Sequence, residues 1–169
     1  MVDALPQGAV IGILGGGQLG RMLSVAASRL GHRTHIYEPG AAPAGDVAHQ
    51  VTTASYDDAD ALRAFAESVD VTTYEPENVP AESLDLLESI RPIRPNRRAL
   101  AVSQDRLTEK EFLAGLGLKT APFANGETEA DLAGALAQIG APAILKTRRM
   151  GYDGKGQIRF SDPAQRDWT

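Results

Sequence analysis

The stretch "GILGGGQLGRM" occupies Gly12 to Met22, where an apolar run ends in three glycines and a helix-like segment follows. The run itself, residues 9–14, has the pattern of a buried parallel strand. Beyond the glycines, apolar residues recur at helical spacing, and Gly31 suits the position just after a helix end: Leu19, Met22, Leu23, Ala26 and Leu30. This order of strand, glycine turn and helix predicts the start of a parallel α/β sheet.

The same alternation continues to about residue 100. Periodicity predicts further strands at residues 34–37, 51–53 and 71–74, helices at 62–69 and 81–89, and an edge strand or turn at 92–95. Strands that alternate with helices imply a parallel sheet covered on both faces. We therefore expect an α/β domain over residues 1–103.

A different rhythm marks residues 104–169, which we expect to form an incomplete second domain. One helix is predicted at residues 106–116, and Thr128 with Asp131 resembles a capping pair that opens another. A strand at 143–147 leads into the basic, glycine-rich loop "RRMGYDGKGQ", residues 148–157, and a returning strand at 158–160 follows.

Composition excludes several classes of function. The net charge of −5 over 169 residues argues against a general nucleic-acid binder, which normally has a basic face. The absence of cysteine excludes disulfides, thiolate metal sites and a cysteine nucleophile. No stretch approaches the roughly 20 apolar residues of a membrane span, and the three histidines share no metal-ligand spacing. We expect a cytoplasmic protein with no membrane or nucleic-acid partner and no metal ligands in this chain.

The glycine turn allows more than one interpretation. Gly15, Gly17 and Gly20 match the fingerprint of a dinucleotide-binding turn, and Glu38 lies 18 residues beyond Gly20, where a ribose-binding acid belongs. The glycines could instead serve only a tight turn between strand and helix. Gln18 at the mouth of the helix could equally face a small polar substrate.

Two later motifs contain charged residues that could bind a ligand. In "TTYEPENVP", Glu75 follows a predicted strand at the edge where α/β sheets bind ligands, although a solvated loop is the plainer interpretation. Lys146 at a strand end, followed by Gly151, Gly154 and Gly156, suits nucleotide phosphates, because lysine supplies charge and glycines let main-chain N–H groups close around oxygens. A plain hairpin is the alternative, but the loop is far longer than a two-residue turn.

Taken in order, the motifs "GILGGGQLGRML", "YEPENVP", "DRLTEKEFL", "TAP" and "AILKTRRMGYDGKGQ" resemble the 5-(carboxyamino)imidazole ribonucleotide synthase family of ATP-grasp ligases. The resemblance covers essentially the whole chain. It implies a Rossmann-like preATP-grasp domain with a parallel sheet, followed by the start of an ATP-grasp domain. It also implies ATP-dependent carboxylation of 5-aminoimidazole ribonucleotide by bicarbonate in purine biosynthesis, with release of ADP and phosphate.

The resemblance implies a role for individual residues of this sequence. The implied ATP contacts are Arg106, Lys146 and the lid loop, namely Gly151, Tyr152, Asp153, Gly154, Lys155, Gly156 and Gln157. The implied substrate contacts are Gln18, Leu19, Glu75, Tyr152, Asp153 and Lys155. Tyr152, Asp153 and Lys155 are the candidate catalytic residues; Lys155 would meet the ribonucleotide phosphate and Asp153 the exocyclic amine.

The chain departs from the family pattern in its length. Family members are about twice as long, and their magnesium-binding residues lie in the half that has no counterpart here. We therefore expect an N-terminal portion, inactive alone, of an enzyme that uses ATP and Mg²⁺ and forms a homodimer at full length. Two alternatives stay open: the related ATP-grasp glycinamide ribonucleotide transformylase, and an NAD-binding module, which explains only residues 1–38.

Overall fold

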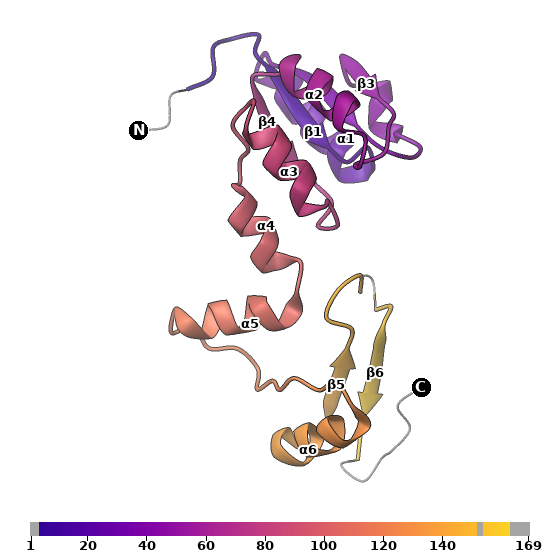
Figure 1. The fold of residues 1–169 in the computed structure, drawn as a ribbon, viewed down its shortest axis with the longest axis vertical. Helices are drawn as coiled ribbons and strands as arrows, with labels where there is room; N and C mark the ends of the chain where they lie inside the picture. Colours follow the sequence, from indigo (N-terminus) through magenta and orange to yellow (C-terminus); the bar gives the residue numbers. More distant parts are fainter. Residues whose placement is uncertain (1–3, 152–153, 163–169) are drawn as a thin grey trace. The chain divides into compact units, whose positions relative to one another are not determined.

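The structure is a computed structural model that describes residues 4–151 and 154–162. The chain forms two compact units, Met1–Ala101 and Val102–Thr169 (Figure 1). Each unit has its own sheet. Tyr152 and Asp153, which the sequence implicates in catalysis, lie outside the described residues.

The first unit contains the predicted parallel sheet. Its strand order is β3-β2-β1-β4, with every neighbouring pair parallel. The strands are β1 (Val10–Leu14), β2 (Arg33–Tyr37), β3 (Gln50–Thr52) and β4 (Val71–Tyr74). Ile93 adds a single parallel bridge to Thr72, which confirms an edge contribution from the proline-flanked segment. The predicted α/β class is thus confirmed.

Helices cover both faces of this sheet. On one face, α2 (Ala59–Glu67) and α3 (Ala81–Glu88) pack side by side (Figure 1). The larger core lies there, because the strands and these helices bury large apolar side chains together: Leu14, Tyr37, Leu62, Phe65, Leu84, Leu87 and Ile93. A smaller cluster of Ile13, Ile36 and Ala44 lies on the other face, beneath α1 (Gln18–Arg29) and the short 3-10 helix η1 (Pro43–Asp46).

Helix α1 approaches the sheet through small residues. Gly20, Ser24 and Ala27 are its buried positions, and they lie on one face at helical spacing. The apolar stripe noted in the sequence does not face the sheet: Met22 is 58% exposed and Leu30 is 74% exposed. Small side chains bring the helix axis close to the strands. This close approach positions the helix N-terminus directly beside the glycine turn.

The second unit begins within α4 (Arg97–Ser103) and continues through α5 (Arg106–Gly115) and α6 (Glu129–Ile139) to the antiparallel pair β5 (Ala143–Lys146) and β6 (Gln157–Phe160). The predicted cap of α6 is confirmed, because Thr128 and Asp131 form a reciprocal capping box. Helices η1 and α4 are absent from the predictions. Both are short, and each buries one residue, so neither produces a clear periodic signal.

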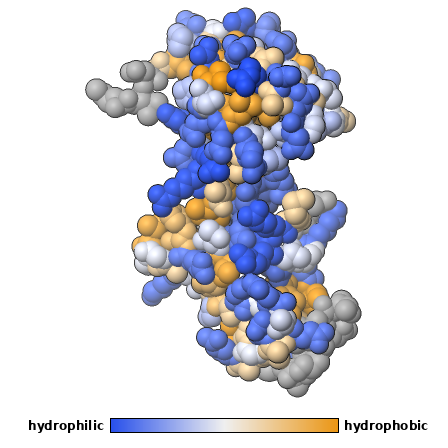
Figure 2. All heavy atoms as spheres, viewed as in Figure 1, coloured by the Kyte–Doolittle hydropathy of each residue, from blue (hydrophilic) through white to orange (hydrophobic). Residues whose placement is uncertain are grey.

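No helix among the residues that the structure describes is long and apolar enough to cross a membrane. Hydrophobic side chains do gather over α5 and the segment after it (Figure 2). Phe112, Leu116 and Leu118 are exposed there, and an open pocket of about 490 Å³ includes Leu118, Phe123 and Ile139. This pocket has no charged side chain in its lining, so it is not the phosphate site that the sequence predicts.

The buried His35 ties β2 to its neighbours. Its Nδ1 lies 2.7 Å from Ser68 Oγ and its Nε2 lies 2.8 Å from Thr52 Oγ1. Because Ser68 Oγ donates its proton to the Phe65 carbonyl, it accepts from Nδ1–H, and Nε2 accepts from Thr52. Burial, with a smaller contribution from the nearby His49, lowers the pKa of His35 to about 4. His35 is therefore a neutral core residue.

This environment makes stability depend on pH. The unfolded chain binds a proton at His35 near pH 6.5 and the folded chain only near pH 4, so stability present above pH 6.5 is lost as the pH falls towards 4. Between pH 7 and pH 5 we expect a loss of about 2 kcal/mol in unfolding free energy from this group. His35→Gln should flatten this slope in urea titrations, whereas His49→Gln at an exposed site should retain most of it. Equal slopes in wild type and His35→Gln would contradict the assignment.

Candidate functional site

The glycine turn after β1 is packed against protein on both sides. Gly15 has φ +106°, and a Cβ there would lie 2.6 Å from Pro76 Cδ and 2.8 Å from Glu75 Oε2. A Cβ on Gly16 would lie 2.8 Å from Ala42 Cβ. The Gly16 carbonyl also accepts a hydrogen bond from Ala44 N at 2.9 Å. These neighbours require glycine at both positions, independently of any ligand.

Glu38 occupies the amide that a dinucleotide turn would offer. Its Oε2 accepts the Gly16 N–H at 2.8 Å, and its Oε1 accepts the Gly40 N–H at 3.1 Å. Both carboxylate oxygens therefore bind the protein's own backbone. A ribose would have to displace one of these bonds, and a pyrophosphate near Gly16 would face the Glu38 charge. The geometry disfavours the NAD-binding interpretation of this turn.

A second carboxylate, Glu75, lies beside the same turn at the carboxyl end of β4. Burial, and then the charge of Glu38, raise the pKa of Glu75 above its usual value. Tyr56 belongs to the same cluster: its hydroxyl is buried without a hydrogen-bond partner, and burial followed by Glu38 and Glu75 raises its pKa. This edge of the sheet is acidic, and it suits a ligand that brings N–H or O–H donors.

Gln18 and Leu19 border this acidic edge. They are the first residues of α1, they follow Gly17 directly, and both are exposed. The structure therefore brings Gln18, Leu19 and Glu75, three residues predicted from the sequence, to one edge of the first unit. Tyr56 could not be assigned to a site from the sequence, because only the packing of the loop after β3 brings it near the two carboxylates.

The glycine-rich loop of the second unit joins β5 to β6. Thr147 N donates to Gly156 O at 2.9 Å and closes the base of the loop. A Cβ on Gly151 would lie 2.9 Å from Thr147 Oγ1, and one on Gly156 would lie 2.7 Å from it. Gly154 and Gly156 have φ of +79° and +66°. The predicted long loop is confirmed: its glycines wrap the backbone around the Thr147 side chain.

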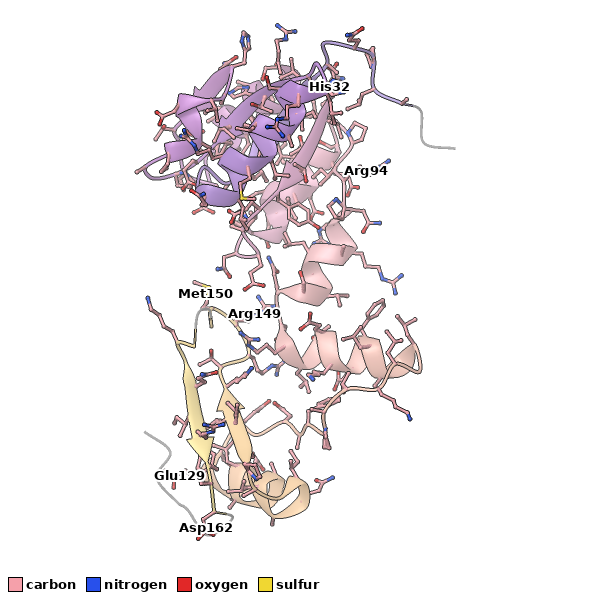
Figure 3. The ribbon with its side chains drawn as sticks, turned by 180° about the vertical axis from the view of Figure 1, so that it is seen from behind. His32, Arg94, Glu129, Arg149, Met150 and Asp162 are labelled. Atoms are coloured by element: carbon pink, nitrogen blue, oxygen red, sulfur yellow. The ribbon has the colours of Figure 1, made fainter. Side chains whose placement is uncertain are left out.

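Cationic groups border this loop. Lys146 is exposed at the end of β5, opposite Gln157 across the ladder. Arg106 opens α5, and its Nη2 donates to Gly151 O at 2.6 Å. The structure thus brings Lys146, Arg106 and Gly151, which the sequence assigned to ATP, to one loop. Figure 3 shows Arg149 and Met150 in the same loop beyond β5.

Metal binding has no visible basis in this part of the chain. Within residues 4–151 and 154–162, no three His, Cys, Asp or Glu side chains are grouped so that they could hold an ion. Magnesium prefers carboxylate and phosphate oxygens in octahedral geometry. The described residues of the loop supply cations and backbone amides, which are groups that can bind phosphate oxygens.

The chain combines a Rossmann-like sheet and its glycine turn with a second unit and its cationic glycine loop, and the matching family models assign this chain to the preATP-grasp and ATP-grasp class. The chain belongs to the family of ribonucleotide synthetase preATP-grasp domains, whose model matches residues 9–104, and an ATP-grasp domain model matches residues 111–168.

Within this class the chain is similar to N5-carboxyaminoimidazole ribonucleotide synthases. The Brucella melitensis enzyme is 50% identical over 159 residues, which are 94% of this chain and 44% of that protein. The Staphylococcus aureus N5-carboxyaminoimidazole synthetase complexed with ADP has a TM-score of 0.88 at 42% identity, over 94% of this chain and 43% of that one. The Aspergillus clavatus synthase in complex with ADP and 5-aminoimidazole ribonucleotide has a TM-score of 0.79 at 30% identity, over 93% and 42%. The chain spans less than half the length of these relatives.

Close packing at the turn yields a direct test. A Cβ on Gly20 would overlap the carbonyl oxygen of Gly15, a backbone atom that cannot move aside, whereas a Cβ on Gly17 would meet open space. Gly20→Ala should lower the unfolding free energy by about 2 kcal/mol or more, the cost of overpacking. Gly17→Ala, the matched control, should change it by less than about 1 kcal/mol. Urea unfolding followed by circular dichroism measures both; equal effects would refute the packing account.

Proposed function

We propose that this chain is the N-terminal portion of an ATP-dependent ligase that carboxylates 5-aminoimidazole ribonucleotide with bicarbonate. The observation that carries the proposal is the pairing of an acidic glycine turn with a cationic glycine loop in one chain of this family. Relatives that the chain matches over more than nine-tenths of its length are N5-carboxyaminoimidazole ribonucleotide synthases, and one of them is described with ADP and 5-aminoimidazole ribonucleotide. The products would be N5-carboxyaminoimidazole ribonucleotide, ADP and phosphate.

In the first unit, the acidic edge would receive the donor-rich part of the substrate. Glu75 would accept a hydrogen bond from the ribonucleotide, and Gln18 and Leu19 would line the entrance. Glu38 would hold the glycine turn in shape, because both of its oxygens bind backbone amides. The raised pKa of Glu75 is consistent with this role, because a donor from the ligand would offset the burial of the carboxylate and the repulsion from Glu38.

In the second unit, the glycine loop would hold the nucleotide phosphates. Lys146 would supply charge, and backbone N–H groups of Gly151–Gln157 would close around the oxygens. Arg106 would act from the start of α5, where it already binds the Gly151 carbonyl. Lys155 would meet the ribonucleotide phosphate, and Tyr152 and Asp153 would complete the substrate side of the loop.

The proposed reaction has two steps. A bicarbonate oxygen attacks the γ-phosphorus of ATP, and ADP leaves as carboxyphosphate forms. The exocyclic amine then attacks the carbonyl carbon, phosphate leaves, and the amine releases a proton, for which Asp153 is the proposed acceptor. The protein contributes positioning and charge stabilisation, as in other phosphoryl transfers.

Several properties of the whole protein complete the proposal. The described residues contain no cluster of three or more His, Cys, Asp or Glu side chains that could hold Mg²⁺, so its ligands would include other residues, and no step is assigned to the ion here. The functional division would fall between residues 1–103 and 104–169. The full-length enzyme would be a cytoplasmic homodimer, and the 169-residue chain alone would be inactive.

A substrate panel tests the proposal against its alternatives. With ATP, magnesium and bicarbonate, 5-aminoimidazole ribonucleotide should stimulate ADP release by the protein with its complete ATP-grasp domain, and the 169-residue chain should show no such stimulation. Stimulation by glycinamide ribonucleotide with formate would instead identify the transformylase. Saturable NADH binding at micromolar concentration would support the dinucleotide module and overturn the proposal.

Lys146→Ala should weaken ATP use in the complete protein. Loss of a contact to an ionised partner costs about 1.5–3 kcal/mol, which corresponds to roughly 10- to 150-fold in kcat/KM for ATP. Lys119→Ala, at an exposed site far along the chain from the loop, is the matched control and should keep wild-type kinetics. Unchanged kinetics in Lys146→Ala would remove this residue from the phosphate site.

A further inference from the structure

The carboxylate of Asp105 joins the start of α5 to the glycine loop. Only 6% of Asp105 is exposed, and its Oδ1 accepts the backbone N–H groups of Leu107 and Thr108 at 3.0 and 3.2 Å, so it caps the helix. The same carboxylate receives Arg148 from the loop: Nε lies 3.1 Å from both oxygens, and Nη2 lies 2.8 Å from Oδ2. Arg149 Nε approaches to 3.6 Å.

The next residue fixes the loop at two further points. Arg106 donates its backbone N–H to Arg148 O at 3.0 Å and its Nη2 to Gly151 O at 2.6 Å. Positions 148 and 151 are thus both held by the start of α5. Between them, Met150 adopts φ +62°, a left-handed conformation that a non-glycine residue rarely keeps unless its surroundings impose it. The exposed Met150 side chain does not supply that constraint, so the two anchored ends do.

The electrostatics keep this anchor charged. Burial acts to raise the pKa of Asp105, but hydrogen bonds from Arg148, Thr108 and Leu107, together with the Arg148 charge, outweigh it and hold the pKa below its usual value. The Asp105 hydrogen bond in turn raises the pKa of Arg148. Arg148 is committed to this carboxylate through a bidentate contact, and is therefore less available as a phosphate ligand than the neighbouring Lys146.

We propose that Asp105 is a positioning residue for the nucleotide loop. Through Arg148 and Arg149, it holds the first limb of the loop in the form in which Gly151 and Gly156 close over Thr147. That the loop binds a nucleoside triphosphate rests on the proposed function. That Asp105 anchors the loop does not depend on the proposed function. A preorganised loop presents its backbone N–H groups to phosphates without first paying the ordering entropy of a free loop.

Asp105→Asn separates anchoring from helix capping, because asparagine caps helices as well as aspartate but lacks the charge that attracts two arginines. In hydrogen exchange of the 169-residue chain, the amides of Arg106 and Thr147, which donate to Arg148 O and Gly156 O, should exchange about 10-fold faster or more, the effect of a lost charge-assisted contact. The amides of Leu107 and Thr108 should keep their wild-type rates. Asp46→Asn, which breaks the exposed Arg21–Asp46 pair in the first unit, is the matched control and should change neither region.

A double-mutant cycle and ATP kinetics complete the test. Arg148→Gln should reproduce the loop effect of Asp105→Asn, and the double variant should be no worse than either. In the complete protein, Asp105→Asn should raise KM for ATP about 10-fold, while kcat and the KM for 5-aminoimidazole ribonucleotide should stay within about 2-fold of the wild-type values. Unchanged loop exchange, or equal acceleration at Leu107 and Thr108, would reduce Asp105 to a helix cap and overturn the proposal. Faster loop exchange in a protein that does not use ATP would refute only the proposed function.

Discussion

The contact between Gly20 and the carbonyl oxygen of Gly15 sets the geometry of the first unit. Backbone meets backbone there, so no side chain can be accommodated, and α1 lies against β1 with only Ser24 and Ala27 as further buried positions. Close approach brings the start of α1 to the carboxyl end of the sheet. Gln18, Glu38 and Glu75 then border one turn, although they are far apart in the sequence. Parallel sheets gather ligand-binding residues at this edge because all their strands end there.

The two glycine-rich segments use their glycines in the same way. In each, a missing Cβ makes room for the protein's own atoms: Glu75 and Ala42 at the first turn, and Thr147 in the second loop. A glycine fingerprint is therefore evidence of close packing, and a ligand can be inferred from it only with further evidence. At the first turn, the contacts disfavour the dinucleotide that the fingerprint suggests, because Glu38 already accepts the Gly16 N–H. The charge around each segment, rather than its glycines, separates their roles.

Much of the fold could be predicted from local sequence. Strand β4 has the predicted bounds, Gly31 follows the end of α1 in a left-handed conformation, and the Thr128–Asp131 cap forms as expected. These features depend on neighbours within a few residues. The orientation of α1 could not be predicted in this way. Its apolar stripe is the more obvious candidate for the buried face, but the small residues Gly20, Ser24 and Ala27 are the ones that pack against the sheet. The roles of Tyr56 and Asp105 also depend on contacts with residues far along the chain, which periodicity does not report.

The charge at the two segments argues for a division of labour in the proposed function. Glu38 and Glu75 make the first turn a poor place for an anion, since burial strengthens their repulsion of a phosphate. Around the second loop, Asp105 neutralises part of the arginine charge, and Lys146 stays exposed at the end of β5. The proposed function accordingly assigns hydrogen-bond donors of the ribonucleotide to the first turn and phosphate groups to the second loop. Because a carboxylate repels the same oxygens that a lysine attracts, each segment disfavours the kind of group that the other would bind.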